Sequence, residues 1–166
     1  MKKIILSSML SVITILSYAQ SPLSKGSSQL NLGVGFSGWG IPVYIGFDHG
    51  VGSDITLGLE LSYRSYAERY NGYDYNHSIV GFSGNANYHF GRVMDIPSKF
   101  DFYAGLNLGF YSWSSPNSYP GTHSSGLGLG AQVGGRFFFS SKTALNLEFG
   151  GNNAFSNGKF GLTFKL

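Results

Sequence analysis

Apolar and polar residues alternate along most of this chain. The last seven residues show the pattern most clearly, because Phe160, Leu162, Phe164 and Leu166 are apolar and the residues between them are small or polar. Successive side chains of a β-strand point to opposite faces, so this alternation predicts a strand with one apolar and one polar face. An unpaired apolar strand at a chain end favours aggregation. Pairing of the last strand with the first in a closed barrel would remove that edge.

Seven further segments alternate in the same way, and each is close to the ~9–11 residues that a tilted transmembrane strand needs. They are Gln29–Phe36, Val43–Val51, Ile55–Tyr66, Ser78–Phe90, Phe100–Trp113, Gly126–Phe139 and Ala144–Gly151. Short connections (Gly52–Asp54, Ser140–Lys142) alternate with longer polar ones (Ala67–Asn76, Ser114–His123), as is typical of membrane barrels. We therefore predict an all-β fold, an eight-stranded antiparallel up-and-down transmembrane β-barrel.

Composition agrees with a wall that alternates between lipid and a polar interior. Charged residues make up 11% of the chain, well below the ~25% of soluble domains. The chain has 25 glycines and no cysteine, so disulfides and thiolate chemistry are excluded. The competing fold is a soluble secreted barrel or sandwich.

The first residues have the pattern of a secretory signal peptide. Lys2 and Lys3 precede the apolar run Ile4–Leu16, and Ser17–Ala19 supplies small residues for cleavage before Gln20. We predict a signal peptide over residues 1–19 and a single barrel domain over residues 20–166. Cleavage removes two basic residues and leaves a net charge close to zero, so nucleic acid is not an expected partner.

The apolar residues at the last, third-last and fifth-last places resemble the C-terminal signal of bacterial outer-membrane barrels. The whole mature chain resembles the small eight-stranded OmpA/OmpX-type barrels. The resemblance implies a bacterial outer-membrane location, with outer-membrane lipid, lipopolysaccharide and the barrel assembly machinery as partners. It also favours an envelope-structure or binding role with no enzymatic activity and no cofactor.

If the apolar faces meet lipid, the other faces line a lumen that eight strands leave just wide enough for side chains. Buried charges are costly unless they pair, so we expect a polar plug with Arg136 near Glu60 and Glu148. The alternative is a narrow channel for small solutes. The predicted plug contains Asp48, Glu60, Arg64, Asp101, Arg136, Glu148 and Lys165.

Tyrosines are frequent in the predicted outer loops. Exposed tyrosine-rich loops suit adhesion or ligand capture, although the sequence does not identify a ligand. The binding candidates are Tyr66, Tyr70, Tyr73, Tyr75 and Tyr119. Aromatic residues near strand ends also predict an interfacial girdle, formed at this rim by Tyr63, Tyr66, Tyr111 and Trp113.

Catalytic and metal motifs are weak. His123-Ser124-Ser125 resembles the His-x-Ser element of outer-membrane lipid A deacylases, in which His123 would be the base and Ser125 the nucleophile. Gly126 stands where that family continues with Asn, and no acidic partner is evident nearby. The four histidines, His49, His77, His89 and His123, lack metal-ligand spacing. We therefore predict no catalytic residues and no metal site.

Overall fold

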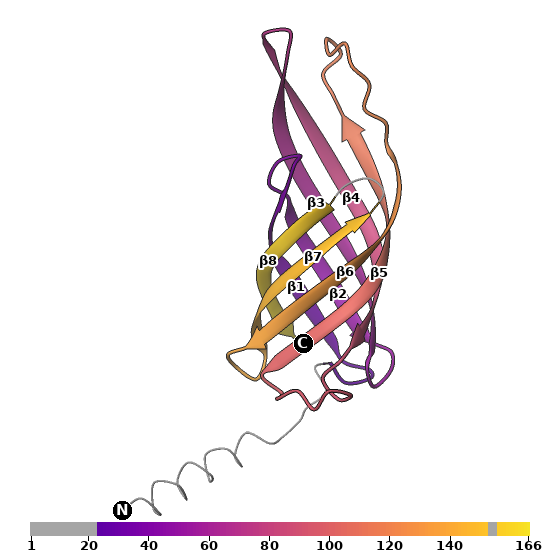
Figure 1. Cartoon of the computed structure of the whole chain (residues 1–166), viewed down its shortest axis with the longest axis vertical. Coiled ribbons are helices and arrows are strands. Elements are labelled where there is room, and N and C mark those ends of the chain that lie inside the picture. The colour runs from indigo at the N-terminus through magenta and orange to yellow at the C-terminus, as the bar shows by residue number, and fades with distance from the viewer. Residues whose placement is uncertain (1–22, 153–155) are drawn as a thin grey trace, which may run out of the picture.

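The computed structural model describes residues 23–152 and 156–166 as one closed β-barrel. Each strand pairs antiparallel with the next, and the last pairs with the first (Figure 1). The predicted fold class is confirmed. Within the described ranges, no helix is long and apolar enough to cross a membrane. The strands are β1 (Ser28–Ser37), β2 (Val43–Gly50), β3 (Ile55–Tyr70), β4 (Tyr73–His89), β5 (Phe100–Ser114), β6 (Gly126–Phe138), β7 (Thr143–Asn152) and β8 (Ser156–Lys165).

The barrel closes through β1 and β8, as the terminal alternation predicts. Leu30 lies opposite Phe164 and Leu32 opposite Leu162. The amide of Leu166 donates a hydrogen bond of 3.0 Å to the carbonyl of Ser28. Directly opposed residues share a face of the sheet, so the outward apolar sets of the two strands form one surface.

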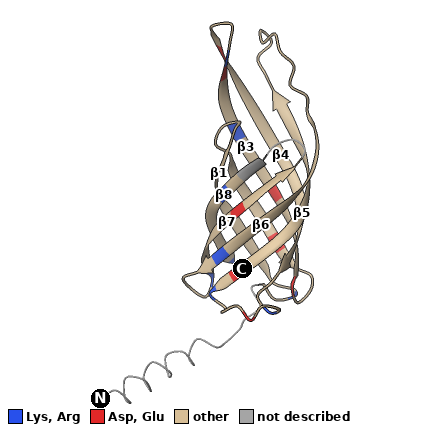
Figure 2. Cartoon of the chain, viewed as in Figure 1, with Lys and Arg blue, Asp and Glu red and all other residues tan. Residues whose placement is uncertain are grey.

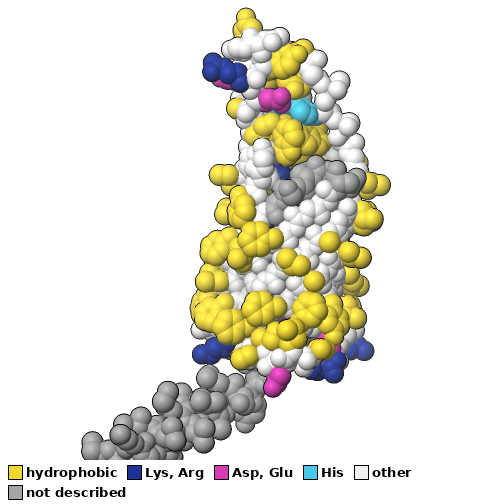
Figure 3. Space-filling model, in the orientation of Figure 1, with side chains coloured by type: hydrophobic (Ala, Val, Ile, Leu, Met, Phe, Trp, Pro, Cys, Tyr) yellow, Lys and Arg dark blue, Asp and Glu magenta, His cyan; other side chains and the backbone are white. Residues whose placement is uncertain are grey.

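The barrel is apolar outside and polar inside. Leu106 and Leu129 on the outer wall are 64% and 65% exposed, and hydrophobic side chains cover the outer wall in Figure 3. Gln29 and Thr163 are fully buried inside. Soluble domains bury apolar residues and expose polar ones, so this inverted arrangement fits a wall that faces lipid.

One end of the barrel rises well above the rest because β3, β4 and β5 have 16, 17 and 15 residues (Figure 1). A transmembrane strand needs only ~9–11 residues. At about 3.3 Å per residue and a strand tilt of ~35–45°, the extra length projects roughly 15 Å beyond the bilayer. Because membrane barrels carry their longer loops outside the cell, we call this the outer end.

The predicted loop Ala67–Asn76 is wrong, because β3 and β4 continue through it to a two-residue turn. Asn71 and Gly72 have φ angles of +51° and +85°, which a type I′ hairpin turn requires. Glu68 pairs with Tyr75, and Tyr70 with Tyr73. Outside the membrane both faces of a hairpin meet water or other loops, so the apolar alternation that marks a strand is lost here.

The β2–β3, β4–β5 and β6–β7 connections join the strands at the opposite end, where the described C-terminus also lies (Figure 1). There Arg92 Nε donates hydrogen bonds of 3.1 Å to both carboxylate oxygens of Asp54 and ties two connections together. These hydrogen bonds lower the pKa of Asp54. The predicted signal peptide over residues 1–19 lies outside the described residues, as does the connection at 153–155.

A charge on the lipid face should impair assembly more than a charge on the lumen face. Leu106 points outward, whereas Asn107 points inward and donates to Gln132 Oε1 at 3.0 Å. Leu106→Arg should cost ~2–4 kcal/mol near the midplane and strongly reduce folding into lipid vesicles. Asn107→Arg should fold better. The heat-modifiable fraction on a gel measures this, and equal tolerance of both changes would contradict the register.

Candidate functional site

The first layer of the lumen is organised around Arg136 on β6. Its Nη2 lies 2.9 Å from Asp48 Oδ2 and its Nη1 lies 3.0 Å from Asp101 Oδ2. The guanidinium carbon also lies 4.4 Å from the centre of the Tyr103 ring. All these side chains are buried. Charge-assisted hydrogen bonds to both carboxylates compensate a cation that would otherwise be very costly to bury.

Both carboxylates of this layer have further hydrogen-bond partners. Gln29 and Asn31 each donate a hydrogen bond of 2.9 Å to Asp48 Oδ2. His89 Nδ1 lies 2.7 Å from Asp101 Oδ1, and its Nε2 lies 3.0 Å from Thr56 Oγ1. An ionised carboxylate only accepts, so His89 donates from Nδ1 and accepts from the threonine hydroxyl when its ring is neutral. The layer is therefore a connected hydrogen-bond network.

A second layer is organised around Lys159 on β8. Its Nζ lies 2.7 Å from Glu60 Oε2 and 2.7 Å from Glu148 Oε1. Tyr103 donates a hydrogen bond of 2.8 Å to Glu148 Oε2 and so joins the two layers. Figure 2 shows acidic and basic residues on the strands themselves as well as in the connections.

The expected pairing of Arg136 with Glu60 and Glu148 is wrong. Cross-strand register explains the observed partners, because Asp101 lies directly opposite Arg136 and Glu148 directly opposite Lys159. The sequence reasoning missed Lys159 because it began the last strand one residue later. Alignment of neighbouring predicted strands around their turns is the signal that would have found both pairs.

The other two predicted plug residues also point inward but lie towards the two ends. Arg64 is buried and donates a hydrogen bond of 3.0 Å to Ser37 Oγ. Lys165 is half-buried, with its Nζ 4.2 Å from the centre of the Phe138 ring. The structure thus places all seven predicted residues on the lumen side, with Glu60 and Lys165 only partly buried.

Little free space remains beside the two charged layers. Two cavities among the lumen side chains leave about 10 and about 30 Å³ for the centres of water molecules. A single water needs ~10–15 Å³ by this measure, so the smaller cavity has room for about one water and the larger for about two.

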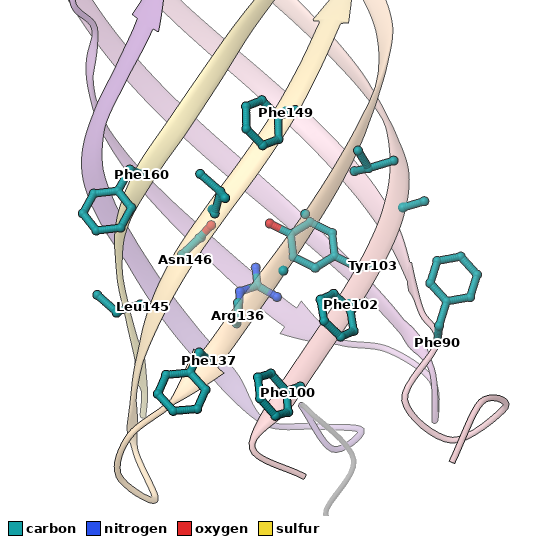
Figure 4. A pocket seen from close by; sticks show the side chains of 15 residues that line it. Phe90, Phe100, Phe102, Tyr103, Arg136, Phe137, Leu145, Asn146, Phe149 and Phe160 are labelled. Carbon is teal, nitrogen blue, oxygen red and sulfur yellow. The ribbon is translucent and has the colours of Figure 1, made fainter. Parts of the chain in front are cut away.

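A larger apolar groove of about 580 Å³ lies on the outer wall across β5, β6, β7 and β8 (Figure 4). Its floor passes over Gly134 and Gly135, which have no side chain to fill it. Phe102, Phe137 and Phe149 line it from outside, whereas Arg136 lies behind the wall. The groove therefore opens onto the lipid-facing side of the wall.

An aromatic cluster lies at the outer end of the barrel. Trp39 from the β1–β2 connection contacts Tyr66 and Trp113, with ring centroids 5.4 and 5.3 Å apart. Tyr66 stacks on His77 at 5.1 Å, and Trp113 stacks on His123 at 4.8 Å. We use the term aromatic cluster for Trp39, Tyr66, His77, Trp113, Tyr119 and His123.

The predicted girdle at this rim is wrong for three of its four residues. Tyr63 is 50% exposed on the outer wall. Tyr111 is buried inside, and Tyr66 and Trp113 pack over it and Ile79. Tyr66 and Trp113 share the inward face of their strands with Arg64 and Tyr111, which alternation alone would have indicated.

The five tyrosine candidates occupy different environments. Tyr73 and Tyr70 flank the hairpin turn and are 71% and 42% exposed. Tyr119 packs against Tyr75 and Tyr70, with ring centroids 5.2 and 6.2 Å apart, and so joins the β5–β6 connection to the hairpin. Burial and the neighbouring carboxylate of Glu68 raise the pKa of Tyr119. Tyr66 belongs to the aromatic cluster and is not a free loop residue.

The candidate catalytic residues do not form a nucleophile–base pair. His123 Nε2 lies 3.3 Å from Glu68 Oε2, an acidic partner that the sequence reasoning did not find. Ser125 Oγ accepts a hydrogen bond of 3.0 Å from the amide of Trp113. Among the described residues, no hydrogen bond joins His123 to Ser124 or Ser125. The arrangement thus lacks the contact by which a base activates a serine.

Loss of Lys159 should destabilise the barrel more than loss of another lumen lysine. Lys159→Ala leaves two carboxylates facing each other in the lumen, at a cost of ~3–5 kcal/mol. Lys165→Ala removes a lysine that contacts a ring and should cost much less. Urea unfolding in lipid vesicles measures both. Adding Glu148→Gln to Lys159→Ala should restore part of the stability, and a failure to do so would contradict the pairing.

Comparisons with known proteins agree with the observed architecture. The family model described as the outer membrane protein beta-barrel domain matches residues 8–165. None of the curated proteins matches the chain. The N-terminal β-barrel domain of Pseudomonas aeruginosa OprF superposes with a TM-score of 0.63 at 16% identity, covering 86% of this chain and 98% of that one.

Two further solved structures share the fold. Pseudomonas aeruginosa OprG has a TM-score of 0.68 at 9% identity, covering 87% of this chain and 97% of that one. Yersinia pestis Ail, in complex with the heparin analogue sucrose octasulfate, has a TM-score of 0.55 at 10% identity. This match covers 86% of this chain and 99% of that chain.

Proposed function

The chain belongs to the outer membrane protein β-barrel family, and from that premise we propose that it is a closed barrel that acts by binding at its outer end. The observation that carries the proposal is the extension of β3, β4 and β5 beyond the length a bilayer requires. Extended strands add no anchoring in the membrane. They hold a tyrosine-bearing surface roughly 15 Å above it.

The contents of the lumen support a closed barrel. Arg136 and Lys159 each bridge carboxylates on two other strands, so the ion pairs cross the lumen as well as following the wall. Above them the aromatic cluster covers the outer end. The small cavities beside the charged layers have room for isolated waters rather than for a continuous water column. A solute would have to break several buried ion pairs to pass.

The outer end suits a neutral ligand better than a polyanion. Arg69 and Asp74 on the hairpin form an exposed ion pair of 3.5 Å, which balances their charges. The connection 115–125 carries no Lys, Arg, Asp or Glu. Tyr70 and Tyr73 offer exposed rings with polar tips, a combination enriched at protein interfaces. We infer that the ligand is a protein or neutral glycan surface outside the cell.

The proposal also includes a route of export and assembly into the outer membrane. A cleaved signal peptide over residues 1–19 would deliver the chain to the periplasm. The alternating β8 strand would then be read by the barrel assembly machinery, with lipid and lipopolysaccharide as the surrounding partners. Pairing of β8 with β1 completes the wall.

Electrical recording tests the closed lumen. We expect little or no conductance from the wild-type protein in planar bilayers, because the charged layers fill the lumen. Arg136→Ala removes the guanidinium between Asp48 and Asp101 and should produce small, flickering openings. Lys165→Ala serves as the matched control. Large, steady openings of the wild-type protein would contradict the closed barrel and would indicate a solute channel.

Cell adhesion tests binding at the outer end. A non-adhesive bacterial host that displays the barrel should bind one or more immobilised matrix proteins or neutral glycans in a panel. Tyr73→Ala and Tyr70→Ala should reduce this binding severalfold, because both rings are exposed. Tyr63→Ala is the control, since Tyr63 lies on the same strand as Tyr70 but its ring is exposed on the lipid-facing wall. No binding to the panel, or equal loss in the control, would contradict the proposal.

A further inference from the structure

Three side chains able to bind a metal ion meet at the outer end of the barrel. Glu68 on β3, His77 on β4 and His123 in the β5–β6 connection each place one ligand atom within 4.8 Å of the other two. Figure 3 shows a histidine beside an acidic side chain in this region. We propose that these three residues form a site for a divalent transition-metal ion, with Zn²⁺ as the best fit. The site goes beyond the proposed function, because it depends neither on a closed lumen nor on what the tyrosines bind.

The distances suit zinc. Zn²⁺ bonds of ~2.0–2.1 Å in a tetrahedral site place neighbouring ligand atoms about 3.3–3.4 Å apart. Glu68 Oε2 lies 3.3 Å from His123 Nε2 and 3.7 Å from His77 Nε2. The two imidazole nitrogens are at most 4.8 Å apart. Because His123 lies in a connection rather than a strand, a small movement of its side chain brings the three atoms into coordination geometry.

The second observation is a buried nitrogen without a hydrogen-bond partner. His77 is 1% exposed, and its Nε2 has no hydrogen-bond partner although it faces the Glu68 carboxylate. Its Nδ1 lies 2.8 Å from Ser115 Oγ. When Nδ1 donates to the serine, the Nε2 lone pair faces a carboxylate oxygen, so two acceptors oppose each other. A cation between them satisfies both groups.

The opposite tautomer leads to the same conclusion. A proton on Nε2 would lie on a nitrogen 3.7 Å from the carboxylate oxygen, which is too far for a hydrogen bond. Metal-binding histidines commonly use their second ring nitrogen to hydrogen-bond an oxygen, which fixes the ring. Ser115 is placed to do this for His77.

Aromatic packing holds both imidazoles in place. His77 stacks on Tyr66 at 5.1 Å, and His123 stacks on Trp113 and Tyr119 at 4.8 and 5.3 Å. The side chains of His77 and His123 are 0% and 16% exposed, whereas that of Glu68 is 33% exposed. Ions can therefore enter past Glu68, and a water can supply the fourth ligand. Three protein ligands with one open position form a common zinc arrangement.

The donor set selects the class of metal. Two imidazole nitrogens and one carboxylate oxygen suit Zn²⁺, Cu²⁺ or Ni²⁺, whereas Ca²⁺ and Mg²⁺ prefer oxygen ligands. The competing interpretation is a plain ion pair between protonated His123 and Glu68, packed against aromatic rings. That interpretation requires no metal, so direct measurement of bound Zn²⁺ separates the two.

The test uses the full barrel, produced without a histidine tag and refolded in detergent without lipopolysaccharide, which itself binds divalent cations. Calorimetric titration with Zn²⁺ and elemental analysis of the protein should show one ion per chain. His123→Ala and Glu68→Gln should each weaken Zn²⁺ binding by at least about tenfold, since even changes behind the ligands cost 10- to 100-fold. His49→Ala is the control, because His49 lies at the opposite end beside Ser28.

Heat-modifiability on a gel confirms that each variant is folded, and Glu68→Gln preserves shape at a partly exposed position. Less than one Zn²⁺ per folded wild-type chain would overturn the site. Equal affinity of His123→Ala and His49→Ala would also overturn it. Displacement of the Zn²⁺ by excess Ca²⁺ would do the same, because an oxygen-preferring ion should not replace one held by imidazoles.

Discussion

Lipid offers no hydrogen-bond partners, so each backbone N–H and C=O within the membrane must pair with a neighbouring strand. Closure of β8 on β1 meets this requirement, with the terminal Leu166 amide bound to the Ser28 carbonyl. A closed wall that exposes its apolar face to lipid must turn its other face inward. The polar interior is thus a consequence of the surrounding lipid. The charged layers follow because buried polar and charged side chains need hydrogen-bond and ion-pair partners.

Glycines on the wall make room for the inward side chains. A Cβ on Gly134 would lie 2.3 Å from Tyr103 Cζ, and one on Gly161 would lie 2.7 Å from the Tyr44 hydroxyl. The Tyr103 ring therefore needs glycine at position 134 on the opposing strand. Tyr103 in turn donates to Glu148 and packs against Arg136, so one glycine position supports both charged layers.

The fold could be predicted from the sequence because alternation is a local property that survives wherever one face meets lipid. Its failure at residues 67–76 has the same cause, since above the membrane neither face must be apolar. The inward orientation of Asp101, Glu148 and Arg136 followed from the alternation within each strand alone. Their partners depend on the pairing register between strands, which a turn can shift by one residue. The meeting of Glu68, His77 and His123 could not be predicted, because it brings together three segments through the docking of a connection on a hairpin.

The two halves of the molecule use charge differently because their solvents differ. The exposed pair Arg69–Asp74 at the hairpin, with side chains 74% and 68% exposed, contributes at most about 1 kcal/mol in water. In the lumen, Arg136 on β6 reaches Asp48 on β2, and Lys159 on β8 reaches Glu60 on β3, with little water to screen them. These contacts join strands that are not neighbours in the sheet. They brace the wall from within. At the outer end water would screen such ion pairs, and aromatic ring contacts hold the segments together there instead.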